Sequence, residues 1–346
     1  MAAYSHFARK MAVGDVMATK LRPVDSLEIT FLVDNVVELG PDNSASEVRK
    51  SWQWIKEKKA RPTDVFGGHG LSMLVRTFVG NEVHQIVYDA GPSAGLISHN
   101  LSVLGISLTD TSAVVMSHGH NDHSGGLLFV LKRIGASRTP VYIHPRAFLK
   151  RGKLTTTEQG DKIRELEPAF PKMEMIIEHG GEPYVSSQPE LLAENTIMTS
   201  GEIPRLTSYE RGVPGHRAFV DGKWENDEAI ADDTCLIALV RNKGLVILTG
   251  CCHAGLTNTL QRSMSLVGVN DVGAVLGGFH LVGKTAQAGL EQTVSYLKST
   301  NLQLLVPAHC TGWQATHLLA RSFPAAYASS GVGSRYTVRS TDVKAY

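Results

Sequence analysis

The sequence predicts an α/β fold whose strands are buried on both faces. Short, continuous apolar runs recur along the chain, a pattern typical of such strands. Helix-like patterns separate several of these runs. Polar loops that carry histidines directly follow several runs, at the carboxyl ends of strands, where open α/β sheets place their ligands.

Each expected element rests on one of these patterns. In the first part of the chain, apolar or alternating runs predict strands at 27–34, 70–79, 83–89, 112–117 and 139–145. Apolar residues at helical spacing predict helices at 93–105, which ends at Gly105, and at 126–134. In the last part we expect a helix at about 286–299 and strands at 235–240, 244–250, 272–279 and 302–308.

The segment 146–230 differs from the rest, because its Pro-containing and charged stretches show weaker periodicity. We interpret this segment as an insertion or cap over the core, a usual place for substrate selection. The region 322–346 is rich in Ser, Gly and Ala and is expected to be a C-terminal tail. With these two additions, residues 1–346 are interpreted as a single domain.

The composition excludes several classes of protein. Hydrophobic residues make up 42% and charged residues 19%, which excludes a disordered chain. The 34 basic and 33 acidic residues give a net charge of +1, so we expect no nucleic-acid partner. No apolar stretch approaches the roughly 18 residues of a membrane-spanning helix, and we expect no membrane partner.

Cysteine usage favours a reducing compartment. The four cysteines, Cys235, Cys251, Cys252 and Cys310, do not form a secreted disulfide pattern. The N-terminus lacks the apolar segment of a signal peptide, so a cytoplasmic location is expected. Because the first 25 residues are poor in acids, a weak transit peptide is an alternative. The sequence does not indicate an oligomeric state.

The loop after the strand at 112–117 contains the candidate metal ligands. It has the sequence HGHNDHSGG and places His118, His120, Asp122 and His123 within six residues. Imidazole and carboxylate ligands together suit Zn²⁺, Fe²⁺ or Mn²⁺. In an extended turn the first two histidines can face one point, and Asp122 and His123 a second, so one loop can serve two metals. The alternative is a His-rich surface loop that binds no metal.

This H-x-H-x-D-H motif after a buried strand resembles that of the metallo-β-lactamase fold superfamily. The chain resembles most closely the branch of 7,8-dihydropterin-6-methyl-4-(β-D-ribofuranosyl)aminobenzene-5′-phosphate synthase and its relatives. The matching segments are HGLS at 69–72, SHGHNDHSGGL at 117–127, GEIPR at 201–205, Asp232-Asp233, LTGCCHAG at 248–255, GGFHL at 277–281 and PAHCTG at 307–312. The resemblance implies a four-layer αββα sandwich with the metals at one edge, between two sheets.

The resemblance also implies a set of ligands. His118 and His120 are then expected to bind a first metal, and Asp122 and His123 a second metal, which His309 completes. The alternative for His309 is a structural role.

Two positions depart from the superfamily pattern. Where an Asp usually bridges both metals, this chain has Cys251, which we expect to be either a thiolate ligand or a buried core residue. We expect His253, two residues later, to be the third ligand of the first metal, with a local structural role as the alternative. The usual upstream Gly-His loop is missing, and Asp232 and Asp233 occupy its place as ligands or as groups that position ligands.

The other histidines carry weaker expectations. His280 ends a buried strand and is a pocket candidate, with a structural role as the alternative. His69, in the HGLS segment, is a further pocket candidate. The remaining histidines are expected to be ordinary surface or core residues: His6, His84, His99, His144, His179, His216 and His317.

These expectations lead to a function. Two cations that share a water lower its pKa and hold a hydroxide as nucleophile. We expect a metal-dependent hydrolase whose metal-bound hydroxide attacks an ester, lactone, amide or phosphate-ester bond of a small molecule. Asp122 would be the catalytic residue that orients the hydroxide and moves a proton.

Two zinc ions per chain are expected, with iron or manganese as alternatives. The resemblance implies a different enzyme, a pterin-pathway synthase or transferase of the dihydropterin-aminobenzene-phosphate type. An iron-dependent oxygen or redox enzyme on the same fold is the third possibility, and Cys251 near the metals would suit it.

Overall fold

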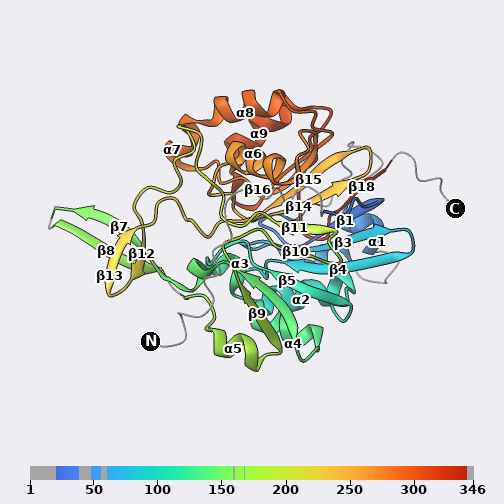
Figure 1. Cartoon of the computed structure of the whole chain (residues 1–346), viewed down its shortest axis with the longest axis horizontal. Coiled ribbons are helices and arrows are strands. Elements are labelled where there is room, and N and C mark those ends of the chain that lie inside the picture. The colour runs from blue at the N-terminus through green and yellow to red at the C-terminus, as the bar shows by residue number, and fades with distance from the viewer. Residues whose placement is uncertain (1–20, 39–47, 56–60, 159, 167, 341–346) are drawn as a thin grey trace.

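Two large β-sheets lie between two groups of helices in the computed structural model (Figure 1). The structure describes residues 21–38, 48–55, 61–158, 160–166 and 168–340. The first 20 residues, which include most of the stretch considered as a transit peptide, lie outside this described part. No helix of the described residues is long and apolar enough to cross a membrane.

The first sheet has eight strands in the order β2-β18-β1-β3-β4-β5-β6-β9. Their bounds are Val48–Arg49, Arg335–Arg339, Ser26–Val33, Ser72–Val79, Glu82–Tyr88, Thr111–Val115, Thr139–Ile143 and Gly181–Val185. Strands β4, β5, β6 and β9 are parallel, so their carboxyl ends meet at one edge. The motif loop leaves the sheet at that edge, directly after β5.

The second sheet has six strands in the order β10-β11-β14-β15-β16-β17. Their bounds are Leu191–Leu192, Ile197–Thr199, Cys235–Val240, Gly244–Thr249, Val272–Gly278 and Leu304–Ala308. Strands β15, β16 and β17 are parallel. The loops that follow these three strands therefore lie along one edge of this sheet.

Three separate apolar clusters show that the layers are helix, sheet, sheet and helix. Alternate residues of β15 point to opposite faces, so Val246 lies in the cluster between the sheets and Ile247 in the cluster under helices. Helices α6 (Leu256–Val267), α8 (Leu290–Lys298) and α9 (Trp313–Ser322) cover the six-stranded sheet. The eight-stranded sheet is covered by α1 (Ser51–Ile55), α2 (Ala94–Leu104), α4 (Leu127–Ile134) and α5 (Met173–Glu178). The expected αββα sandwich is confirmed.

The local patterns account for most of these elements. Each expected strand is present, with its bounds shifted by at most three residues at either end. The helix expected at 93–105 is α2, which begins where Ser93 Oγ accepts a hydrogen bond from the Leu96 amide. It ends at Gly105, whose φ of 58° is the left-handed conformation that glycine adopts easily.

Two expectations differ from the structure. The helix expected at 286–299 is two helices, α7 (Gly283–Ala288) and α8, which meet at Gly289. The region after 322 is more than a tail, because it supplies β18 between β2 and β1. The side chains of Tyr336 and Val338 on β18 are buried, although the surrounding Ser/Gly-rich sequence carries little apolar signal.

The segment 146–230 contains a third, four-stranded sheet in the order β13-β12-β7-β8. These strands are Lys223–Asn226, His216–Val220, Lys150–Thr157 and Gly160–Leu166, and they project from one end of the molecule (Figure 1). The other strands of this segment belong to the large sheets: β9 to the eight-stranded sheet, and β10 and β11 to the six-stranded sheet. We call the four-stranded unit the cap sheet; that it selects substrate stays a prediction.

Candidate metal centre

The candidate site lies where strands of both large sheets end. The motif loop follows β5, and its last part forms the short helix α3 (Asn121–Ser124). Cys251 and His253 follow β15, His280 follows β16, and His309 follows β17. The parallel strands therefore bring together residues that lie far apart in the sequence.

The first group of donors is His118, His120 and His253. One ligand atom from each lies within 4.8 Å of the others. The Nε2 atom of His118 is 2.9 Å from Nδ1 of His120, and the His253 ring packs against both imidazoles at centroid distances of 4.9 and 5.1 Å. These are the three residues expected at the first metal.

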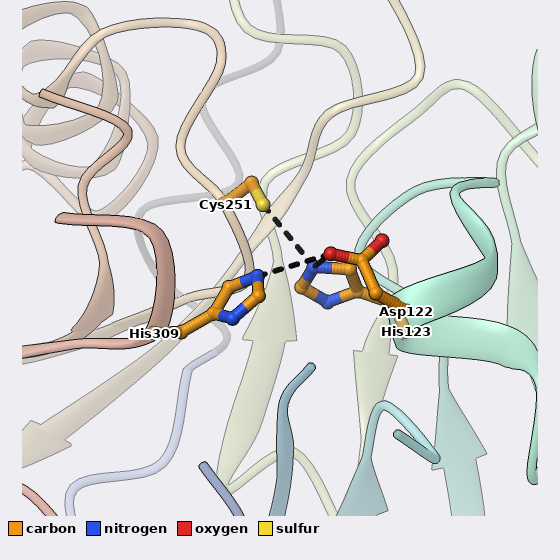
Figure 2. Close-up of side chains that lie close together, drawn as sticks. All are labelled: Asp122, His123, Cys251 and His309. Carbon is orange, nitrogen blue, oxygen red and sulfur yellow. Dashed lines mark hydrogen bonds and ion pairs between the residues drawn. The ribbon is translucent and has the colours of Figure 1, made fainter. Parts of the chain in front are cut away.

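The second group is Asp122, His123, Cys251 and His309, and Figure 2 shows their side chains converging. Cys251 Sγ lies 3.1 Å from His123 Nε2. Oδ2 of Asp122 lies 3.2 Å from His309 Nε2 and 3.7 Å from His123 Nε2. The structure thus brings the expected residues of the second metal together and adds the Cys251 thiol to them.

Cys251 also belongs to a third arrangement, with His253 and His280. Its sulfur is therefore close to donors of both expected metals. His280, the third member of this arrangement, is half-buried and lines the cavity above the site. The Cys251 side chain is 3% exposed and its sulfur faces the donor atoms, so a thiolate ligand and a buried core residue both stay predictions.

The donor chemistry of these groups fits divalent metal ions. Burial lowers the pKa of His118, His120 and His253, that of His120 to about 4, so their imidazoles are neutral near pH 7. His123 and His309 hold the pKa of Asp122 below its usual value although burial opposes the shift. Neutral imidazole and ionised carboxylate are the forms that bind metals. His123 differs: burial lowers its pKa, but Asp122 and Asp89 outweigh that effect and raise it to about 9, so His123 would release a proton on binding a metal.

His253 gives the most direct test of this fit. Its side chain is 5% exposed, and neither ring nitrogen has a hydrogen-bond partner among the described residues. Unpartnered buried polar atoms are rare in folded proteins and call for an explanation such as an ion. A metal bound by the first group would use one of these nitrogens.

Neighbouring groups fix the orientation of the donors. Nδ1 of His123 donates to Asp89 Oδ2 over 2.7 Å, which leaves Nε2 facing the second group. Nδ1 of His309 donates to Asn35 Oδ1 over 2.9 Å in the same way. Such contacts fix the tautomer and ring orientation of metal-binding histidines.

Asp232 and Asp233 do not join any of the three donor groups. Asp232 accepts a hydrogen bond from the Gly119 amide over 2.8 Å and another from Arg151 Nη2 over 2.6 Å. Asp233 accepts from the Ala254 amide over 2.8 Å, while its Oδ1 has no partner among the described residues. Of the two expectations for this pair, their contacts favour positioning the loops over ligation.

A cavity of about 1000 Å³ opens above the donor groups. Asp122, Cys251, His253, His280 and His309 form part of its wall, and the cap sheet contributes another part. His69 also lines the cavity, with Nε2 3.5 Å from Asp122 Oδ2. His280 and His69 are thus both at the pocket, as expected of the pocket candidates.

Sequence reasoning missed several residues of the site. His216, expected to be an ordinary histidine, lies on the cap sheet with Nε2 3.0 Å from His120 Nε2. Asp89 and Asn35 are not among the predicted residues, although Asp89 directly follows β4 and Asn35 stands two residues after β1, where polar residues are informative. His216 had no such signal, because its strand belongs to a segment with weak periodicity.

Comparisons with known proteins agree with this architecture. The metallo-β-lactamase superfamily profile matches residues 30–216. The chain is 30% identical over 261 residues to the 7,8-dihydropterin-6-methyl-4-(β-D-ribofuranosyl)-aminobenzene-5′-phosphate synthase of Methanocaldococcus jannaschii, covering 74% of this chain and 85% of that protein. It is 32% identical over 257 residues to an uncharacterised protein of the same organism, covering 74% and 89%.

A solved structure shows the same fold. Tm1679, described as a metal-dependent hydrolase of the β-lactamase superfamily, aligns with a TM-score of 0.65 and 22% identity. The alignment covers 91% of this chain and 100% of that chain. Because the superfamily profile matches more than half of the chain and the synthase relative is 30% identical, the chain belongs to the metallo-β-lactamase superfamily.

Proposed function

We propose that this chain is a metal-dependent synthase that joins two small molecules, a pterin-type heterocycle and a phosphorylated aromatic amine. The similarity to a synthase over 74% of the chain supports this function better than the hydrolase that the motif alone suggested. The name of that relative describes a dihydropterin linked through its 6-methyl carbon to an aminobenzene that carries a ribofuranosyl 5′-phosphate.

The size of the cavity is the observation that carries the proposal. Sites for drug-sized ligands have volumes of roughly 300–1000 Å³. At about 1000 Å³, the cavity of this chain is at the upper end of that range. It offers room for two substrates, with the donor groups on one wall and the cap sheet on another.

The bond that forms joins the methylene carbon of the heterocycle to the amine nitrogen. The methylene must carry an oxygen leaving group of the phosphate or diphosphate class, whose C–O bond breaks with its electron pair going to oxygen. The amine nitrogen supplies the new pair, and its proton leaves to water. The attack forms an N-alkylanilinium cation, which is acidic enough to lose its proton to water, so no strong base is needed at the site.

The protein's own groups would bind and orient these substrates. The two donor groups, one around His253 and the other around His309, would hold the metals. When bound, divalent cations would stabilise the negative charge on the departing oxygen. The Asp122 carboxylate, which lines the cavity and stays ionised, would accept a hydrogen bond from the amine and so position it. Zinc suits this mixture of donors, with iron or manganese as alternatives.

Hydrolysis of an ester, lactone, amide or phosphate ester is the second candidate function. The specific observation in its favour is that the complete H-x-H-x-D-H set converges at two donor groups. In that case water would take the place of the amine. The identity of the acceptor therefore separates the two functions.

The experiment offers both acceptors at once. Metal-loaded protein is incubated with a hydroxymethyl-dihydropterin diphosphate and 4-(β-D-ribofuranosyl)aminobenzene 5′-phosphate, the phosphorylated amine contained in the relative's name. The products are identified by mass spectrometry. The proposal expects the coupled amine, which Asp122→Asn reduces by roughly 100-fold or more. Formation of the free hydroxymethyl pterin alone would favour the hydrolase, and an unchanged pterin diphosphate would contradict the synthase.

A further inference from the structure

The cap sheet presents a row of basic side chains to the cavity. In the antiparallel pairing of β12, β7 and β8, His216 lies opposite Lys153, and Lys153 lies opposite Arg164. Residues directly opposite in neighbouring strands point to the same face. All three line the cavity, so the row faces its interior rather than the outer face of the cap sheet.

Lys153 and Arg164 carry the charge of this row, and the nearby Glu228 attracts Lys153 without forming an ion pair with it. Among the described residues, neither Lys153 nor Arg164 forms an ion pair with a carboxylate. The Lys153 ammonium donates a hydrogen bond to the Pro214 carbonyl. The nearby Glu228 carboxylate accepts from the Gly215 amide and from Arg217. Like charges directly opposite in a sheet destabilise it, so an anion between them would relieve a cost present in the free protein.

Arg151 shows the contrast on the same strand. It is 5% exposed, and its guanidinium bonds Asp227 and Asp232. Its charge is thus already used inside the protein. Lys153 is half-buried and Arg164 is exposed, so both can reach a ligand in the cavity.

We infer that Lys153 and Arg164 form the anchor for the phosphate monoester of the substrate, an inference that rests on the proposed function and specifies one end of its substrate. Phosphate oxygens accept strong charge-assisted hydrogen bonds from guanidinium and ammonium groups. An anchor on the cap sheet holds the phosphate on a different wall of the cavity from the donor groups. The unphosphorylated end of the molecule can then lie toward Asp122.

Binding of ribose 5-phosphate to the metal-loaded protein tests the anchor directly. The variant is Lys153→Met/Arg164→Met, and the matched control is Lys132→Met/Arg133→Met, which removes the same charges from the exposed face of α4. Calorimetry gives the dissociation constant for ribose 5-phosphate, ribose and pyrophosphate. Metal content and thermal unfolding verify that each variant is folded and loaded.

We expect the cap variant to bind ribose 5-phosphate at least ~10-fold more weakly than the unaltered protein, because two charged hydrogen-bonding groups are lost. The control should bind within about twofold of the unaltered protein, and binding should weaken with added salt. Ribose should bind to none of the proteins.

Three results would overturn the anchor. The first is equal binding by the cap variant and the unaltered protein, which would place the phosphate elsewhere. The second is an equal loss in the control, which would indicate a general effect of net charge. The third is a loss confined to pyrophosphate, which would assign the row to the leaving group of the donor.

The binding assay also separates this inference from the proposed function. If the cap variant loses ribose 5-phosphate binding while no protein forms the coupled amine, the anchor stands and the synthase assignment is wrong. If the unaltered protein couples a phosphorylated amine and the cap variant does so with the same KM, the assignment stands and the anchor is wrong.

Discussion

The imidazole of His123 donates a hydrogen bond from Nδ1 to Oδ2 of Asp89 over 2.7 Å, and both side chains are fully buried. The same carboxylate accepts from the amide and the hydroxyl of Ser117, the residue before the motif. Asp89 has a φ of 59°, a backbone conformation that residues other than glycine seldom adopt. The end of β4 thus holds the start of the motif loop and one of its donors in place.

Asp89→Asn should weaken metal binding at the second group. An amide cannot accept all three hydrogen bonds as a carboxylate does, so His123 loses its fixed orientation. Substitutions of such partners typically cost 10–100-fold in metal affinity, and we expect an effect of about that size. Titration with a competing chelator measures it, with the exposed Asp110→Asn as control. Unchanged affinity in Asp89→Asn would show that this contact is only structural.

His253→Ala and His309→Ala should each remove one metal ion, because the two histidines belong to different donor groups. Elemental analysis of each variant, compared with the exposed His317→Ala, measures the stoichiometry. Circular dichroism verifies that the variants are folded. Each folded variant should keep one metal ion. A folded variant that keeps two ions, or none, would show that the two-group arrangement is wrong.

Cys251→Ser should remove a sulfur ligand. Cobalt-substituted protein with a thiolate ligand shows a sulfur-to-metal charge-transfer absorption, and we expect this band to disappear in the variant. Cys252→Ser is the control, since that thiol is equally buried but lies 3.3 Å from the Thr259 hydroxyl and in none of the donor groups. A band that persists in Cys251→Ser would identify Cys251 as a core residue.

Arg151→Met should destabilise the fold. The substitution leaves Asp232, which is 0% exposed, without its cation. It also removes one of the two arginines that pair with Asp227, the other being Arg146. Breaking a buried pair by removing one partner typically costs about 3–5 kcal/mol, and we expect a loss in that range in the free energy of unfolding. Urea denaturation measures it. The exposed Arg138, paired with Glu182, provides the control Arg138→Met, which should cause no measurable change. If Arg151→Met lowered the free energy of unfolding no more than that control does, the ion pairs of Arg151 would not stabilise the fold.

The core of the sandwich could be predicted because its strands carry their own signal. Strands such as β14 and β15 are continuous apolar runs, and the motif loop follows one such run. Strands β7 and β8 could not be predicted in this way, since they are largely polar and find their partners within the cap sheet. β18 was missed for a related reason, because its pairing with β1 joins residues about 300 positions apart.

The same distinction holds for the candidate site. The motif residues His118, His120, Asp122 and His123 are adjacent in sequence and share one loop, so their spacing was informative. Their supporting contacts are long-range. Asp89 follows β4, Asn35 lies in the loop after β1, and His216 lies on the cap sheet. A single sequence shows such residues as isolated polar positions, because the contacts that give them a role arise only when the sheets pack.

Metal stoichiometry tests the central claim most directly, that two adjacent donor groups each hold a metal ion. The measurement is elemental analysis of protein purified without chelator and without added metal. The arrangement of His118, His120 and His253 beside Asp122, His123, Cys251 and His309 predicts two divalent ions per chain, with zinc the expected element. One ion or none per folded chain would contradict the account, because a single donor group cannot support the proposed two-metal chemistry.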